Sequence, residues 1–490
     1  MNIRILVAMQ AVVSAASLVV EIVAGRMLAP YVGMSLYTWT SVIAVVLAGF
    51  SVGHWMGGRL AERPARAALA ANGWAMVAAA LTTAGAVFLL RASAGPMLAL
   101  LQNPVAGIVA LSIIAFFLPS VFAGIPAPIL TQIAVSRAQK QAQEQSGRAL
   151  GAMFAAGAIG AIAGTLLAGF VFIAWLGSSG TLAVVTLCYA LVAAASFAMA
   201  GRDRGAGLIA ASGALMLAVG AALTPGPCDR ESRYFCIRVI EMDDMAGAAT
   251  RLMVLDHLVH GVSAEADSGA MLTPHGAILD ALTRHRMEGR AFEAFFIGGG
   301  SFTLPRAWAD QTARQVVAEI DPQVTRTATD SFWFDPASAE VRNIDARVAL
   351  SRDPARYDVI VGDAFTDIAV PPHLITREFF ALAASRLNPE GIFVMNVIDR
   401  MDRLELVSAL YHTMQTAFPV VELWAEPVSD SDRRRIFILL GGASPTDSPV
   451  IDGVAQRVSS ASLARLSQAQ SPILLTDDRA PIERLLGSLR

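Results

Sequence analysis

The sequence predicts two unlike parts: a helical membrane domain of about seven spans, residues 1–225, followed by an α/β part, residues 226–490. Apolar segments of about 20 residues, the length that crosses a bilayer, fill the first part. That part also holds only 11 of the 37 basic and 4 of the 40 acidic residues. In the second part, apolar β-rich runs alternate with helical runs, which is typical of a doubly wound sheet.

The composition excludes several classes of protein. Only 16% of the residues are charged, against about 25% in soluble chains, and the net charge is +7 in the first part and −10 in the second. This excludes a disordered chain and a nucleic-acid binder with a broad basic face. Three cysteines exclude a disulfide scaffold. Cys228 and Cys236 form one small loop if they face an oxidising compartment, and are otherwise free thiols.

Seven candidate spans account for the membrane domain. They are residues 3–24, 37–57, 69–90, 105–130, 149–175, 180–200 and 206–224. The first is not expected to be a cleaved signal peptide, because further spans follow it directly. In the fifth, Gly160 and Gly164 have the small-xxx-small spacing that lets two helices approach closely.

Basic residues predict the orientation of these spans. Eight lie in the loops after the second, fourth and sixth spans, and the alternate loops carry only Arg26 and Arg91. In a bacterial inner membrane this places the N-terminus in the cytoplasm and the residues after a seventh span outside. If residues 206–224 do not cross, the second part lies in the cytoplasm instead.

Ionisable residues within the spans are candidates for function. Glu21 either pairs with Arg26 or another helix, or helps to move a cation or polar substrate. Residues 53–63 loosely resemble the loop between the second and third helices of major facilitator transporters. Transport is therefore one hypothesis for the membrane domain.

The second part begins with a small β-domain, residues 226–272, in which residues 234–240 and 251–262 form a β-ribbon. Residues 273–490 form the doubly wound domain. Its seven expected strands are residues 292–297, 315–320, 340–344, 357–362, 391–397, 420–424 and 435–440. Its clearest helices are residues 275–287, 377–387 and 401–417. Ligands bind such sheets at the carboxyl ends of the strands.

Glycines and acids stand at these strand ends. The turn after the first strand consists of Gly298, Gly299 and Gly300, which let a ligand approach the backbone closely. Glu319 ends the second strand, where a carboxylate can accept both hydroxyls of a ribose. Asp345 follows the third, where it can accept the amine of an adenine, and Asp363 follows the fourth. No P-loop is present and no Lys or Arg directly follows the glycines to meet a pyrophosphate, so the pattern favours an adenosyl ligand without phosphates.

Four motifs carry a specific resemblance. They are Gly298-Gly-Gly, Glu319-Ile-Asp, Asp345-Ala-Arg347 and Tyr357-Asp-Val-Ile-Val-Gly-Asp363. They resemble those of the spermidine synthases, the polyamine aminopropyltransferase family. The whole chain is similar to the bacterial proteins in which a multispan membrane region is fused to a spermidine synthase-like domain. The resemblance implies a seven-stranded, Rossmann-like domain of the methyltransferase type.

The resemblance also implies an activity, a transfer of the aminopropyl group of decarboxylated S-adenosylmethionine to a small-molecule amine. Asp363 matches the catalytic acid and acts as the base for the amine. The donor site then comprises the three glycines, Glu319, Asp345 and Ala346. The acceptor site comprises Asp256, His260 and Asp367. No metal and no nucleic acid are expected, and a homodimer is left open.

The chain departs from the family around the acceptor and the end of the donor. Ser301-Phe302 replaces the usual Asp-Gly, and His260 stands in place of a glutamine. One alternative is therefore a transferase that uses intact S-adenosylmethionine and moves its methyl or aminocarboxypropyl group. Another is a transporter or sensor that binds a polyamine or nucleoside without turnover. Asp477 and Asp478 either cap a last helix that begins near Pro481 or contact the site, and capping is the favoured interpretation.

Overall fold

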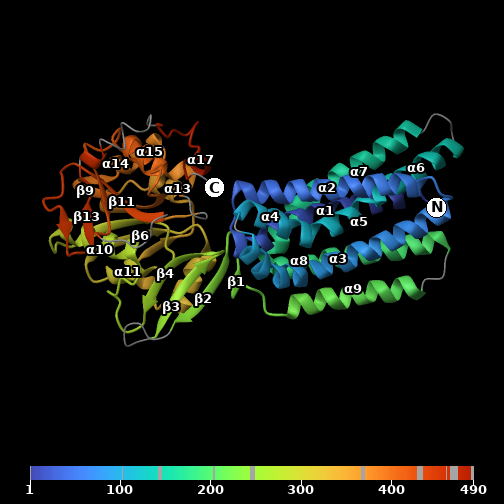
Figure 1. The fold of residues 1–490 in the computed structure, drawn as a ribbon, viewed down its shortest axis with the longest axis horizontal. Helices are drawn as coiled ribbons and strands as arrows, with labels where there is room; N and C mark the ends of the chain where they lie inside the picture. The colour runs from blue at the N-terminus through green and yellow to red at the C-terminus, as the bar shows by residue number, and fades with distance from the viewer. Residues whose placement is uncertain are drawn as a thin grey trace. The chain divides into compact units, whose positions relative to one another are not determined.

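The computed structural model describes residues 2–101, 103–141, 146–201, 205–242, 249–365, 370–427, 434–459, 461–463 and 473–486. The chain forms two compact units, Met1–Cys236 and Ile237–Arg490. Figure 1 shows the first as a bundle of long helices and the second as sheets flanked by helices.

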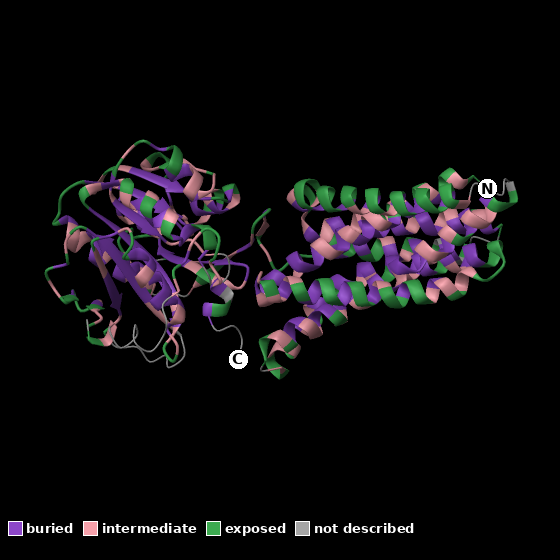
Figure 2. Ribbon diagram, turned by 90° about the horizontal axis from the view of Figure 1, so that it is seen from above, coloured by how far each residue is buried: buried purple, intermediate pink, exposed green. Residues whose placement is uncertain are grey.

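The helical unit has a largely apolar core and an apolar exterior. Its helices are α1 (Ile3–Val32), α2 (Leu36–Ala61), α3 (Ala65–Leu100), α4 (Pro104–Ser112), η1 (Ile113–Phe117), α5 (Leu118–Gly124), α6 (Pro126–Gln141), α7 (Ser146–Leu167), η2 (Ala168–Phe172), α8 (Ile173–Ala200) and α9 (Gly205–Leu223). Buried residues line the inner faces of the helices, and exposed residues cover the outside (Figure 2). Many exposed side chains are large and apolar, such as Trp175 and Phe170, as expected of a surface that meets lipid.

Five helical runs among the described residues are long and apolar enough to cross a membrane. They are Ile3–Val32, Leu36–Ala61, Ala65–Leu100, Pro104–Lys140 and Ser146–Ala200. The last run is interrupted at Gly177, whose φ of 65° and ψ of 178° are not helical. The expected spans 149–175 and 180–200 lie on either side of this break, and α9 follows with 19 residues. The count of seven spans stays a prediction.

The close helix packing predicted for Gly160 and Gly164 is confirmed. Both lie on α7 against α1, where a Cβ atom would stand 2.1 Å from the carbonyl oxygen of Ala11 and 2.2 Å from that of Ala15. Only a hydrogen atom fits at these two positions, so the glycines set the distance between the two helices.

Replacing Gly160 with alanine is expected to lower the free energy of unfolding by about 1–3 kcal/mol, because the added methyl group forces α1 and α7 apart. Thermal unfolding of the full chain in detergent measures this. Gly151→Ala is the matched control on the same helix, since nothing lies within 4 Å of a Cβ atom there. Equal melting temperatures for the two variants would contradict the packing argument.

The expected pair between Glu21 and Arg26 is not formed. The guanidinium of Arg26 instead donates to two main-chain carbonyl oxygens, that of Tyr234 at 2.5 Å and that of Ser232 at 3.0 Å. These carbonyls belong to the segment that follows α9 and β1 (Arg230–Glu231). The same segment contains a disulfide between Cys228 and Cys236, so the two cysteines form the small loop.

The second unit begins with an antiparallel meander of β2 (Cys236–Met242), β3 (Thr250–Leu255) and β4 (Leu258–Ala264). This matches the β-ribbon predicted over residues 234–240 and 251–262, and the second range folds as two strands because the chain reverses at residues 256 and 257. Asp256 adopts a φ of 55° there. Aspartate tolerates this left-handed conformation better than most residues, but its presence alone does not reveal a turn.

In the described part of the chain, the large sheet has nine strands, in the order β12-β13-β10-β11-β9-β8-β5-β6-β7. They are β5 (Phe292–Ile297), β6 (Thr312–Ala318), β7 (Glu340–Arg342), β8 (Tyr357–Gly362), β9 (Leu387–Arg400), β10 (Val420–Ala425), β11 (Arg434–Gly442), β12 (Val450–Ile451) and β13 (Ala455–Arg457). All seven predicted strands are present. The predicted number is wrong by two, because β12 and β13 are too short to show a pattern.

Five of these strands are parallel, from β7 through β6, β5 and β8 to β9, and β11 runs antiparallel to β9. The helices of this unit are α10 (Pro274–Met287), α11 (Thr303–Ala307), α12 (Pro322–Ser331), η3 (Pro336–Ser338), α13 (Ala346–Arg352), η4 (Pro372–Leu374), α14 (Arg377–Ser385), α15 (Glu405–Met414) and α17 (Ile482–Leu485). The parallel strands end at one edge of the sheet, which is where ligands bind such folds.

Candidate active site

The glycine turn after β5 lies in tight contact with two other elements. Gly298 has a φ of 89°, and a Cβ atom on it would stand 2.7 Å from the carbonyl oxygen of Asp363. Gly300 has a φ of 52°, and its Cβ atom would stand 2.7 Å from the carbonyl oxygen of His260 on β4. Both positions therefore need glycine. The turn brings the end of β8 and the strand β4 to one place.

Glu319 follows β6 and faces this turn. Its carboxylate is buried and accepts the backbone N–H groups of Gly299 and Asp321, each at 2.9 Å. Burial raises the pKa of Glu319 to about 7, while the hydrogen bonds from the backbone amides act in the opposite direction. The protonation state of this acid therefore changes near neutral pH.

Asp345 ends the segment after β7 and caps α13. One carboxylate oxygen accepts the N–H of Val348 at 3.0 Å, and the other lies 2.7 Å from Nε2 of His373. Ala346 is the first residue of the capped helix and is buried. Since each carboxylate oxygen can accept two hydrogen bonds, Asp345 retains the capacity to accept a further donor.

Asp363 stands at the end of β8, beside the glycine turn. Its backbone N–H donates to the carbonyl oxygen of Ile297 at 3.0 Å, which ties it to β5. One carboxylate oxygen accepts the side-chain N–H of Asn396 at 3.1 Å, and the other lies 3.9 Å from Nε2 of His275. Asn396 is buried on β9. It orients a carboxylate that stays partly open, with 26% of its side chain exposed.

Two cavities meet at Asp363. The larger, of about 250 Å³, is lined by His260, His275, Asn396 and a wall of apolar side chains from β4, β9 and β11. The smaller, of about 30 Å³, lies along the glycine turn. Burial lowers the pKa of His260, which favours its neutral form. The carboxylate of Asp363 thus borders both a glycine-lined space and an apolar chamber.

Sequence reasoning missed the partners Asn396 and His275. Asn396 is the only polar residue between residues 392 and 398, and such an interruption of a buried strand is a usable signal. His275 lies in the first turn of α10, 88 positions before Asp363 in the sequence. The two residues come together only in the folded chain.

Two further residues, Asp256 and Asp367, were predicted to bind the acceptor. Asp256 lies in the turn between β3 and β4 and is not among the described residues that line the two cavities. Asp367 lies outside the described residues. The roles of both in binding the acceptor stay predictions.

The expected capping of the last helix by Asp477 and Asp478 is wrong. The residue before α17 is Pro481, and no side chain caps the helix. Asp477 instead forms a bidentate ion pair with Arg347, in which each carboxylate oxygen lies 2.7 Å from a guanidinium nitrogen. It also accepts a hydrogen bond from the hydroxyl of Thr376. These contacts lower the pKa of Asp477 to about 2. This pair therefore connects the C-terminal segment to α13.

Comparison with known proteins confirms the predicted resemblance to polyamine aminopropyltransferases over part of the chain. No family model matches the chain. A probable polyamine aminopropyl transferase of Bifidobacterium longum is 26% identical over 280 residues, which cover 52% of this chain and 61% of that protein. A polyamine aminopropyltransferase of Vibrio vulnificus is 33% identical over 122 residues, 24% of this chain and 41% of that protein. An N-terminal histidine N-methyltransferase of Emericella nidulans is 28% identical over 137 residues, 27% of this chain and 24% of that protein.

The chain thus spans less than two thirds of the curated relatives it matches. Among solved structures, a probable spermidine synthase from Corynebacterium glutamicum aligns with a TM-score of 0.44 and 21% identity, covering 50% of this chain and 95% of that one. A human methyltransferase-like protein 13 in complex with SAH aligns with a TM-score of 0.31 and 21% identity, covering 44% of this chain and 93% of that one.

Proposed function

We propose that this chain is a membrane-anchored aminopropyltransferase that moves an aminopropyl group from decarboxylated S-adenosylmethionine to an amine. The observation that carries the proposal is the position of Asp363. Its carboxylate is held by Asn396 and borders both the glycine-lined space and the apolar chamber. The two similar bacterial proteins named for aminopropyl transfer support the same reaction.

The donor side uses the glycine turn and two acids. Ionised Glu319 accepts the ribose hydroxyls, and Asp345 accepts the adenine amine at the start of α13, where Ala346 supplies apolar contact. The first basic side chain after the glycines, Arg306, donates to the carbonyl oxygens of Ala264 and Glu265. The site therefore suits a sulfonium nucleoside rather than a dinucleotide.

The acceptor side uses the larger cavity. The lone pair of a neutral amine attacks the carbon beside the sulfonium, a C–N bond forms, the C–S bond breaks, and methylthioadenosine leaves. The proton lost by the amine nitrogen passes to the carboxylate of Asp363. Alignment of amine and carbon supplies the remaining acceleration.

Ser301 favours a second candidate donor, intact S-adenosylmethionine. In the resembled family an aspartate at this position holds the free amine of the decarboxylated donor. Here a buried serine stands instead, hydrogen-bonded to Thr303 at 2.7 Å. A neutral hydroxyl does not repel the carboxylate of the intact donor.

Product analysis separates the two candidates. The full chain is incubated with an amine mixture and each donor in turn, and the nucleoside product is identified by mass spectrometry. Methylthioadenosine from the decarboxylated donor supports the proposal. S-adenosylhomocysteine from the intact donor supports methyl transfer instead.

Donor affinity is expected to fall as the pH falls through about 7. Glu319 has a raised pKa, so it is protonated below this pH and loses the negative charge that attracts the ribose hydroxyls. We expect binding of methylthioadenosine, measured by calorimetry, to be about tenfold weaker at pH 6 than at pH 8. Affinity that does not change over this range would contradict an ionised Glu319 in the site.

We further propose that the N-terminus lies in the cytoplasm and the second unit on the other side of a bacterial inner membrane. The excess of basic residues in the loops after the second, fourth and sixth expected spans supports this. The disulfide between Cys228 and Cys236 supports it independently, because such bonds persist in oxidising compartments.

A reporter fused after Arg490 tests this orientation. Alkaline phosphatase is expected to be active there and green fluorescent protein to be dark. The opposite result would place the second unit with the cytoplasmic pool of S-adenosylmethionine and would contradict the proposed orientation.

A further inference from the structure

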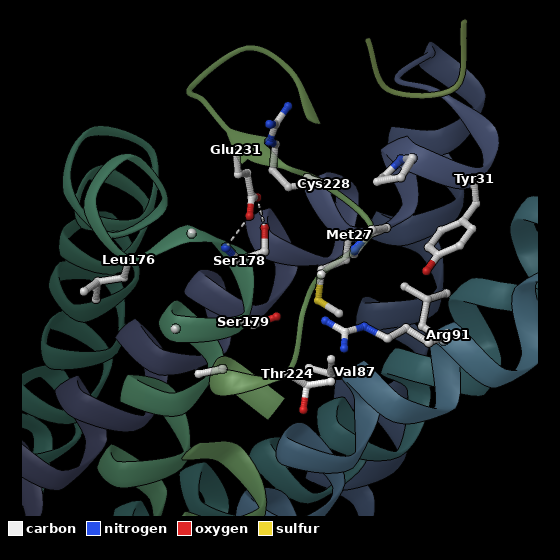
Figure 3. A pocket seen from close by; sticks show the side chains of 18 residues that line it. Met27, Tyr31, Val87, Arg91, Leu176, Ser178, Ser179, Thr224, Cys228 and Glu231 are labelled. Carbon is white, nitrogen blue, oxygen red and sulfur yellow. Dashed lines mark hydrogen bonds between the residues drawn. The ribbon is translucent and has the colours of Figure 1, made fainter. Parts of the chain in front are cut away.

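The helical unit contains a cavity of its own at the end of the bundle where α1 ends (Figure 3). Its volume is about 190 Å³, room for roughly six water molecules at about 30 Å³ each. The walls come from α1, α3, α8 and the segment of residues 222–231. All of these elements belong to the first compact unit.

One wall is built around the break at Gly177. The break exposes the first amide groups of the helical stretch that continues to Ala200. Glu231 occupies this helix start, because its carboxylate accepts the backbone N–H of Ser178 at 2.9 Å and also the Ser178 hydroxyl. A Cβ atom on Gly177 would stand 3.0 Å from that carboxylate. Glu231 is therefore fixed in place, with its charge directed at the helix start.

The two arginines that line the cavity, Arg91 and Arg26, form no ion pair with an acid among the described residues. Arg91 of α3 extends its guanidinium into the cavity (Figure 3), and none of the described residues pairs with it. Arg26 is 8% exposed, and its two terminal nitrogens donate to the carbonyl oxygens of Ser232 and Tyr234. Its Nε is buried without a hydrogen-bond acceptor in the described part of the chain.

The balance of charge is therefore positive. Among the described residues, two guanidinium groups line the cavity, and the one acid on its wall, Glu231, is already engaged by Ser178. Leaving a buried cation without a counter-charge is costly. Guanidinium groups match the paired oxygens of carboxylates and phosphates in particular.

From this geometry we propose that the cavity is a binding site for a small oxyanion, a carboxylate or phosphate group, held by Arg91 together with the Nε of Arg26. The inference does not depend on the reaction proposed for the second unit. Apolar contacts from Met27, Val87 and Leu176 leave room for a short carbon chain beside the anionic group. The oxyanion belongs either to a small soluble molecule or to a lipid headgroup.

The full chain in nanodiscs tests the site. Inorganic phosphate and succinate are each titrated by calorimetry in phosphatidylcholine nanodiscs, and melting temperatures are compared in discs with and without phosphatidylglycerol. Saturable binding of a soluble probe indicates a soluble ligand. Stabilisation by phosphatidylglycerol without such binding indicates a lipid headgroup.

Arg91→Gln is expected to weaken the observed binding at least tenfold, or to abolish the stabilisation by phosphatidylglycerol. Arg66→Gln, on the exposed first turn of the same helix, removes the same charge and is expected to change neither. Arg91→Lys keeps the charge without the planar fork and is expected to bind with intermediate affinity, which separates a lost contact from a misfolded bundle. The proposal is overturned if no probe binds and phosphatidylglycerol has no effect, or if Arg91→Gln behaves as Arg66→Gln does.

Discussion

Replacing Asp363 with asparagine is expected to lower kcat by about 10²- to 10⁴-fold, the usual contribution of a positioned general base. Asparagine keeps the size of the side chain but cannot take the proton of the amine. Asn396 can still contact the remaining oxygen, so the site should keep its shape. Binding of methylthioadenosine should therefore change little, and steady-state kinetics together with calorimetry measure the two effects separately.

The control for this variant is Asp310→Asn. Asp310 is exposed in the turn after α11 and before β6, so the substitution removes one negative charge away from both cavities. Its turnover should equal that of the unmodified chain. If Asp363→Asn retained the same turnover, Asp363 would not be the base and the proposed role would be wrong.

Replacing Glu319 with glutamine is expected to raise the KM for the donor by about 10- to 100-fold, which corresponds to losing hydrogen bonds to a charged acceptor. The effect on kcat should be much smaller, because Glu319 contacts the nucleoside and not the reacting atoms. The pH dependence of donor affinity near 7 should disappear in the same variant. Initial rates at varied donor concentration and pH measure both effects.

Glu265→Gln supplies the comparison for Glu319. Glu265 is exposed after β4, and its substitution should leave both the KM and its pH profile unchanged. A Glu319→Gln variant that still lost donor affinity below pH 7 would show that another group causes the titration. Equal losses in kcat and in donor affinity would instead indicate that the substitution disturbs the glycine turn.

The strands and helices of the second unit were predictable where their burial requires a regular pattern of apolar residues in the sequence. In a parallel sheet covered on both faces, a strand such as β5 or β8 is an almost unbroken apolar run. The strands β12 and β13 have two and three residues, and runs this short carry no such pattern. The sequence did not place the turn at Asp256, because apolar residues of β3 and β4 flank it on both sides.

The candidate site was predictable only in part. Acids at the carboxyl ends of successive strands could be found because the fold brings those ends together. The side chains beside Asp363 come from elsewhere in the chain, Asn396 from β9 and His275 from α10, and the sequence does not show that they meet this acid. The same holds for Arg26, which contacts carbonyl groups more than 200 positions further along the chain.

Transfer of an isotope label tests the central claim most directly. The purified full chain is given decarboxylated S-adenosylmethionine labelled in its aminopropyl group, together with a mixture of amines, and the products are separated by mass. The account predicts that the label moves to the nitrogen of an amine while unlabelled methylthioadenosine is released, and that Asp363→Asn prevents the transfer. A label that stays on the nucleoside with every amine would contradict the account.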